Sequence, residues 1–153
     1  MASTGAAAAF CPTSNLYLGS GLFDIAASDA AALKFALATD VGGGSSFSML
    51  RTMGDAYKVA QLRGQRLSPL RMFYLATLGA ARVLRLQDRI GSFIPGNEAD
   101  FIVLDPHATA LMSRRFGQSP TLSERLLLLA TLGDDRNVAA TYIMGAEVGV
   151  PHG

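Results

Sequence analysis

The stretch FALATDVGGGSSFSML, residues 35–50, decides how this chain folds. Residues 34–39 are an apolar run of the length typical of a buried strand, and the run ends in one acid, Asp40. Three glycines and two serines follow. Residues 46–63, from Phe47 onward, then carry apolar side chains at three- and four-residue intervals. The stretch therefore predicts a buried strand, a pliable loop and a long helix, with a lone carboxylate at the strand end.

A second apolar run, residues 6–11, is stopped by Pro12 and predicts another buried strand. Residues 13–24 predict a loop with one helical turn, and residues 24–32 a short helix. Strand, loop, helix and strand in this order are typical of a parallel βαβ unit. Such strands, each followed by a polar, glycine-rich loop, indicate a βα barrel, which places its chemistry at the C-terminal strand ends. Since a complete barrel needs about 250 residues, we expect only two of its strands here.

Downstream of the glycines, the chain predicts more helix and then a change of character. Ser68 as N-cap and Pro69 at the first helical position predict a helix start, and Gly79 is expected to divide that helical stretch in two. The later elements are predicted as two strands around Pro95-Gly96 with FIVL (101–104) buried on both faces, a polar loop holding Arg114 and Arg115, a Leu-rich helix over 122–132, and a hairpin about Gly145-Ala146.

Composition excludes several classes of function. With 50% hydrophobic residues, 16% charged residues and a net charge of +1, the sequence has no charged block, so we expect no nucleic-acid partner. The single cysteine, Cys11, excludes an internal disulfide and a cysteine-based zinc cluster. The H-x-E and P-C-x-x-C motifs of cytidine-type zinc deaminases are absent. No apolar run is long enough to span a membrane. We therefore expect a cytoplasmic protein without a membrane partner.

Five motifs resemble, in the same order, the C-terminal third of the guanine deaminases, which belong to the amidohydrolase superfamily. They are FCPTSNLYLGSGLFD, ATDVGGGSSFSMLRTM, LATLGAARVL, IGSFIPGNEADFIVLDP and TLGDDRNVAATYIMG, and the resemblance covers residues 8–148. The segment PGNEADFIVLD resembles many amidohydrolases. The segments TDVGGGSSFSML and LGDDRNV are narrower and point to guanine deaminase.

The resemblance implies an α/β fold: the C-terminal part of a TIM-like (β/α)8 barrel plus part of a small β-sandwich. On this basis residues 6–11 and 35–40 are the seventh and eighth barrel strands. Residues 1–85 are expected to form the last two strands and C-terminal helices of the barrel. Residues 86–153 are expected to form the sandwich portion with the Leu-rich helix.

The resemblance also implies chemistry, the zinc-dependent hydrolysis of guanine to xanthine and ammonia. The family holds one zinc ion with an H-x-H after the first strand, one His after each of the fifth and sixth strands, and an Asp after the eighth. Asp40 matches that aspartate, which ligates the metal and takes a proton from the attacking water. By itself, a strand-end Asp before glycine is more typical of a turn. The order of several motifs favours the metal ligand.

Four further residues are candidates for the substrate side of the site. Gly42 and Gly43 permit positive φ angles and the close approach of a substrate. Ser14 and Asn15 follow the seventh strand, at the end of the barrel where Asp40 is expected. There they would support Asp40 or line the purine pocket. A loop-forming Ser-Asn pair is the alternative interpretation.

The histidines depart from the family pattern. The only two, His107 and His152, match no ligand position and are interpreted as exposed loop residues. With one protein ligand where three or more are usual, the chain by itself is expected to be inactive and to represent an incomplete enzyme. The family suggests a homodimer. Two alternatives stay open: a non-catalytic remnant that needs a partner chain, and an amidohydrolase that acts on another purine or a triazine.

Overall fold

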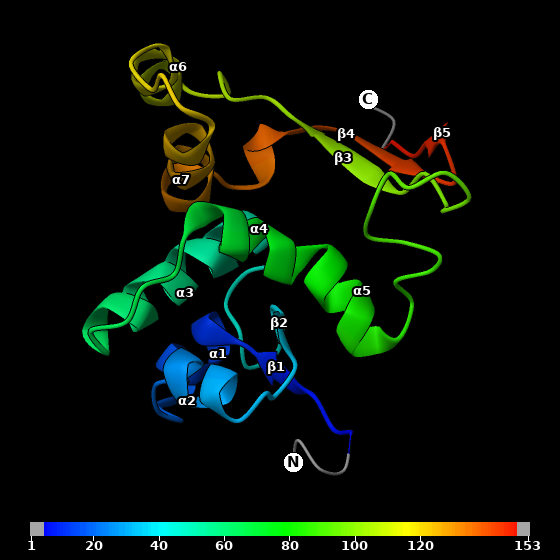
Figure 1. The fold of residues 1–153 in the computed structure, drawn as a ribbon. Coiled ribbons are helices and arrows are strands. Elements are labelled where there is room, and N and C mark those ends of the chain that lie inside the picture. The colour runs from blue at the N-terminus through cyan, green and yellow to red at the C-terminus, as the bar shows by residue number, and fades with distance from the viewer. Residues whose placement is uncertain (1–4, 150–153) are drawn as a thin grey trace.

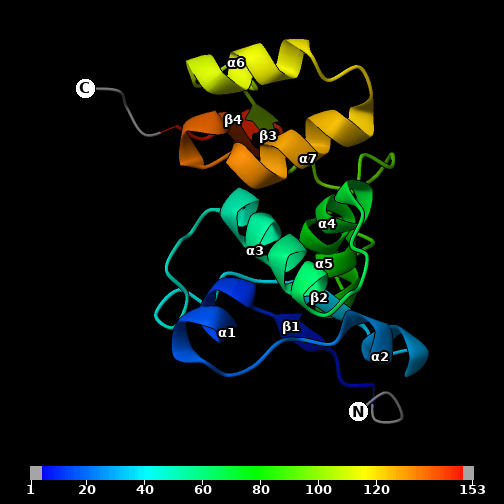
Figure 2. The same ribbon diagram turned by 90° about the vertical axis from the view of Figure 1, so that its left-hand side faces the viewer.

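The computed structural model describes residues 5–149, which build three tiers of mixed α/β structure. Figures 1 and 2 show one tier of β1, β2, α1 and α2, a middle tier of α3, α4 and α5, and a third tier of α6, α7 and the sheet β3–β4–β5. The elements in chain order are β1 Ala8–Phe10, α1 Pro12–Leu18, α2 Ile25–Ala30, β2 Phe35–Leu37, α3 Met49–Leu62, α4 Pro69–Ala76, α5 Leu78–Leu84, β3 Phe101–Leu104, α6 Ala110–Gly117, α7 Leu122–Leu132, η2 Asp135–Asn137, β4 Val138–Ile143 and β5 Ala146–Glu147.

The two strands that precede the expected site run parallel and side by side. Ala8 pairs with Phe35 and Phe10 with Leu37, so the C-terminal ends of β1 and β2 lie at the same edge. Pro12, which has no N–H to continue a ladder, lies two residues after the end of β1 and is the first residue of α1. The predicted parallel βαβ unit is confirmed.

The sequence predicted a loop with a single helical turn after β1, but the structure has the seven-residue helix α1 in this place. Pro12 starts it, and Gly19 ends it with a φ of 68°, the left-handed conformation that glycine adopts without strain. The Gly19 N–H donates to the Asn15 carbonyl. Pro12 and Gly19, which mark the two ends of the helix, can be recognised in the sequence. However, the Ser, Asn and Gly residues of this segment favour a loop by composition.

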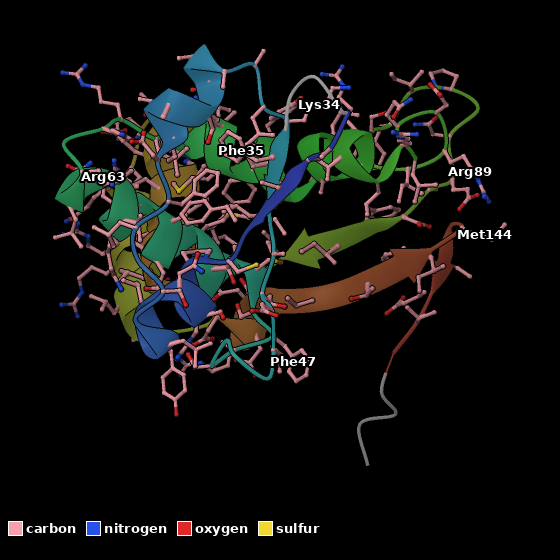
Figure 3. All side chains as sticks on the ribbon, turned by 90° about the horizontal axis from the view of Figure 1, so that it is seen from below. Lys34, Phe35, Phe47, Arg63, Arg89 and Met144 are labelled. Carbon is pink, nitrogen blue, oxygen red and sulfur yellow. The ribbon has the colours of Figure 1, made fainter. Side chains whose placement is uncertain are left out.

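The main core lies between the two parallel strands and helices α3 and α4. Phe10 stacks on Phe23 with ring centroids 4.6 Å apart, and Phe23 contacts Phe35 at 5.1 Å. Phe35 points from β2 toward the helices in Figure 3. On the helical side, the fully buried residues of this core include Ala56, Val59, Ala60 and Met72.

Helix α3 begins at Met49, three residues later than the predicted start at residue 46. Ser48 is its N-cap, and the Ser48 side chain accepts a hydrogen bond from the Arg51 N–H. Phe47, predicted as the first residue of the buried stripe, therefore lies before the helix. It is 84% exposed and projects from the glycine loop (Figure 3).

Helix α4 starts as predicted, at Pro69 with Ser68 as its N-cap. The break before α5 falls at Thr77, whose φ of −127° and ψ of −105° are not helical, and not at Gly79. Gly79 lies within α5, where a β-carbon would stand 2.8 Å from the Tyr74 carbonyl oxygen. Glycine at this position thus permits close packing of the two helices.

Helix α6 was not predicted, because Arg114 and Arg115 indicated a polar loop. The structure places both in the helix Ala110–Gly117, whose N-cap Thr109 accepts from the Met112 N–H. Met112 is only 1% exposed, and it anchors the helix in a small cluster with Leu50 and Leu129. One buried residue is too little periodicity to recognise in the sequence.

The third-tier sheet is antiparallel in the order β3–β4–β5, and its hairpin is confirmed. Met144 and Gly145 form the turn with φ angles of 50° and 78°. The predicted strand before Pro95 is absent from residues 90–100, which form turns and irregular backbone. The predicted burial of β3 on both faces is also wrong in the described chain, since Ile102 is 51% and Val103 43% exposed.

Candidate functional site

Asp40 lies just beyond β2, at the edge where both parallel strands end. Its side chain is exposed, and its φ of 50° lies in the left-handed region, which Asp and Asn tolerate better than most residues. The carboxylate therefore lies at the end of a strand and is exposed to solvent. A single carboxylate so placed can accept a proton or provide one metal ligand.

The loop after Asp40 is closed by backbone contacts that require glycine. The Gly44 N–H donates to the Asp40 carbonyl at 2.5 Å. A β-carbon on Gly44 would stand 2.0 Å from the Thr39 carbonyl oxygen, a distance no pair of such atoms tolerates. Gly44 thus allows the loop to fold back onto the strand end.

Helix α1 contacts this loop through the first of two adjacent hydroxyls. The Thr13 Oγ1 donates to the Thr39 carbonyl at 3.4 Å, and Thr13 is only 4% exposed. The interaction joins residues 26 positions apart in sequence, across the ends of the two strands. Sequence analysis missed Thr13 because no local pattern shows which carbonyl its side chain reaches.

The second hydroxyl, that of Ser14, lies on the side of the Asp40 carboxylate. A β-carbon on Gly43 would stand 2.6 Å from Ser14 Oγ and 3.3 Å from Asp40 Oδ2. Both oxygens therefore face the same small space, which exists because residue 43 has no side chain. The structure brings together three of the predicted site residues, Ser14, Asp40 and Gly43.

The other two candidates take less specific positions. Gly42 has a φ of 121° and is exposed, with no atom within 4 Å of a β-carbon built on it. It therefore supplies the backbone freedom and open space expected of a substrate-side loop. Asn15 is half-buried, and its carbonyl accepts from the N–H groups of Gly19 and Ser20 at the end of α1.

Cys11, the residue after β1, is half-buried. Burial raises the pKa of its thiol, and the negative charge of Asp40 raises it further. Both effects disfavour the thiolate, which is the reactive and metal-binding form of cysteine.

Within residues 5–149, the donor atoms near the strand ends fit one ligand of a zinc site. In residues 5–149, no three His, Cys, Asp or Glu side chains gather to hold a metal ion. His107 is exposed, and its Nδ1 lies 3.0 Å from Ser113 Oγ in the third tier. His152 lies outside the described residues. Asp40 can contribute a carboxylate, while the usual three protein ligands of a catalytic zinc are not assembled here.

A polar pocket of about 240 Å³ lies behind the Asp40 loop, between α3 and the end of α7. Thr13 and Ser45 line its loop side. Its charges are largely paired, because Lys58 contacts Asp55 at 3.0 Å within the same wall. The pocket does not include Asp40, so it stands apart from the carboxylate site.

Comparisons with known proteins agree with this geometry. The sequence profile of the amidohydrolase family matches residues 2–148. The guanine deaminase of Escherichia coli K12 is 50% identical over 148 residues, which cover 97% of this chain and 34% of that protein. Its solved structure superposes with a TM-score of 0.94 over 96% of this chain and 35% of that chain.

Two further similar structures were solved with a bound ligand. A guanine deaminase from C. acetobutylicum with bound guanine is 27% identical, with a TM-score of 0.80 over 97% of this chain and 35% of its own. An adenosine deaminase from Xanthomonas campestris with bound zinc is also 27% identical, with a TM-score of 0.77 over 95% of this chain and 32% of its own.

The extent of the match has two consequences. The chain spans about a third of the length of the curated relatives it matches. The predicted fold class, an α/β part of an amidohydrolase barrel, is confirmed by the superpositions and by the parallel pair β1–β2. Because the family profile matches nearly its whole length, the chain belongs to the amidohydrolase family.

Proposed function

We propose that this chain provides the C-terminal third of a zinc-dependent guanine deaminase, which hydrolyses guanine to xanthine and ammonia. The observation that carries the proposal is the position of Asp40, exposed at the shared C-terminal edge of β1 and β2, in a chain 50% identical to the E. coli guanine deaminase. Active sites of βα barrels lie at this edge. The guanine in the C. acetobutylicum structure supports the same substrate.

In this proposal Asp40 has two roles, as a metal ligand and as the acceptor of a proton. Zinc, when bound, supplies a water that ionises near neutral pH. The Asp40 carboxylate takes the proton released from that water and holds it at one Oδ atom until the departing amine receives it. Gly42, with no atom within 4 Å of a β-carbon built on it, leaves open space for the purine beside the loop, and Gly43 allows Ser14 to approach the carboxylate.

The remaining zinc ligands are expected from the part of the enzyme that the chain does not span. Its relatives are about three times as long, and the superposed adenosine deaminase holds zinc. The complete enzyme is therefore expected to have a histidine set around Asp40. We also infer a homodimer in the cytoplasm, which gel filtration and cell fractionation of the complete protein would test.

A hybrid enzyme tests the proposal directly. In the hybrid, this chain replaces the matching third of the E. coli guanine deaminase, which the TM-score of 0.94 makes structurally feasible. We expect it to bind one zinc ion and to release ammonia from guanine. A folded hybrid that binds zinc but leaves guanine unchanged would refute the proposal.

The two alternatives have separate tests. Large apolar side chains are exposed in this chain, among them Phe47, Phe93 and Met144, which is also the surface expected of a non-catalytic chain that pairs with a partner. A stable monomer in gel filtration would contradict both that alternative and the incomplete-enzyme proposal. A panel of guanine, adenosine and a triazine, offered to the complete native protein, decides the substrate.

A further inference from the structure

Ser14 is held beside the Asp40 loop by the start of α1. It is the third residue of that helix, and only the N-cap Cys11 separates the helix from the end of β1 at Phe10. Ser14 is only 2% exposed, so packing fixes the position of its side chain. A buried serine on the first turn of a helix costs free energy unless its hydroxyl finds a partner.

Because Gly43 has no side chain, the Ser14 hydroxyl and the Asp40 carboxylate both lie next to the small space that a β-carbon would fill. The two oxygens lie 2.6 Å and 3.3 Å from the point that a Gly43 β-carbon would occupy. The Leu18 Cδ1 methyl lies 3.1 Å from the same point, so it closes this space on the apolar side. One water bridging the two oxygens would join the hydroxyl to the carboxylate.

The hydroxyl of Ser14 is available for such a contact. The adjacent Thr13 hydroxyl donates to the Thr39 carbonyl, whereas the Ser14 hydroxyl makes no hydrogen bond to residues 5–149. A carboxylate is the strongest acceptor within reach, and bonds to charged acceptors are the strong ones.

We propose that Ser14 is a positioning residue for Asp40, and that its hydroxyl donates to the Asp40 carboxylate directly or through one water. The inference rests on the proposed role of Asp40. The bond occupies one carboxylate oxygen and leaves the other free to face the metal and the reacting water. Groups that orient a metal ligand in this way typically change metal affinity by about 10- to 100-fold when removed.

The test compares variants of the hybrid guanine deaminase by zinc affinity, measured in competition with a chelator, and by kcat and KM. Ser14→Ala is expected to weaken zinc binding about 10-fold and to lower kcat, with KM unchanged. Ser14→Cys, which keeps the size and a weak donor, should fall between Ser14→Ala and the unsubstituted hybrid. Ser45→Ala removes an exposed hydroxyl from the neighbouring loop and is expected to change nothing.

Two outcomes would overturn the inference. A raised KM with unchanged zinc affinity would show that Ser14 contacts the purine, and unchanged values of all three quantities would show that it does neither. Asp40→Asn in the same assays separates this failure from that of the proposed function. If Asp40→Asn loses zinc affinity and Ser14→Ala does not, only the role of Ser14 is wrong. If Asp40→Asn keeps both zinc affinity and activity, the proposed function itself fails.

Discussion

Gly54 of α3 lies so close to Ala130 of α7 that a β-carbon on Gly54 would stand 2.6 Å from the Ala130 carbonyl oxygen. Both residues are buried, and Ala130 belongs to the main core. The contact is therefore a backbone-to-backbone crossing, which only the absence of a side chain at position 54 permits. It attaches the third tier to the middle tier.

Gly54→Ala is expected to destabilise the chain, because the added methyl meets backbone and α7 must shift. Overpacking of this kind costs about 2 kcal/mol, more than the gain in helix propensity, which is about 1 kcal/mol. Urea unfolding followed by circular dichroism would measure the change. Gly117→Ala is the matched control, since Gly117 is helical with open space around it and should keep the propensity gain, up to about 1 kcal/mol, without any clash. Equal stabilities of the two variants would contradict the close crossing.

Gly44→Ala is expected to damage the site more than the fold. A β-carbon there would stand 2.0 Å from the Thr39 carbonyl oxygen, so the loop has to move away from the strand end. That movement breaks the bond between the Gly44 N–H and the Asp40 carbonyl and displaces Asp40. A misplacement of about 1 Å costs on the order of 100-fold in rate.

The kcat of the hybrid enzyme, measured with guanine, would report this loss. Gly117→Ala again provides the control, because it adds the same methyl far from the loop. If Gly44→Ala keeps full activity, the closed loop is not what positions Asp40.

The elements with strong local signals could be predicted from the sequence. Pro69 after Ser68 started a helix as expected, and α7 has the predicted bounds Leu122–Leu132. The strand that ends before Asp40 was recognisable from its apolar run and the glycines after it. Such signals lie within a few residues of one another, so they do not depend on tertiary structure.

What the sequence did not show depends on contacts between distant segments. The Thr13 bond to Thr39 and the space shared by Ser14 and Asp40 appear only when β1 and β2 lie side by side. Helix α6 depends on one buried side chain. The predicted division into residues 1–85 and 86–153 remains a prediction, although α7 from the second part packs on α3 and α4 of the first.

The pair Asp29–Arg71 makes stability depend on pH at the acid end. Arg71 Nη1 lies 2.7 Å from Asp29 Oδ2, and the Arg71 guanidinium also stacks over the Phe35 ring at 5.5 Å. The hydrogen bond from Arg71 lowers the pKa of Asp29, although partial burial opposes it. A carboxyl group with a lowered folded-state pKa stabilises the fold above its unfolded pKa, about 3.9, and loses that contribution as the pH falls through the folded value.

Asp29→Asn is therefore expected to be less stable than the unsubstituted chain at pH 6, and the difference should shrink below about pH 4. The pair is partly exposed, so the loss at pH 6 should be about 0.5 kcal/mol. Urea midpoints across the pH range would measure it. Asp88→Asn removes an exposed acid that accepts a hydrogen bond from the neighbouring Gln87 side chain and forms no ion pair within residues 5–149; it should show no such trend. A difference that stays constant down to pH 2.5 would exclude the ion pair as its origin.

Asp40→Asn isolates the charge of the proposed metal ligand from the strain of its backbone. Asp40 has a φ of 50°, and asparagine adopts this left-handed conformation as readily as aspartate does. Alanine would add backbone strain, which would confuse a structural effect with a chemical one. The asparagine variant keeps the shape but cannot take up a proton.

We expect Asp40→Asn in the hybrid enzyme to lower guanine deamination by about 1,000-fold, in the range that loss of a general base produces. Zinc binding should weaken as well, because a neutral amide replaces a charged ligand. The melting temperature in the absence of metal should stay the same, since Asp40 is exposed. Asp88→Asn serves as the control for the removal of one exposed charge. An Asp40→Asn enzyme with normal activity would mean that another group accepts the proton, and the strand-end carboxylate would then be only part of the turn.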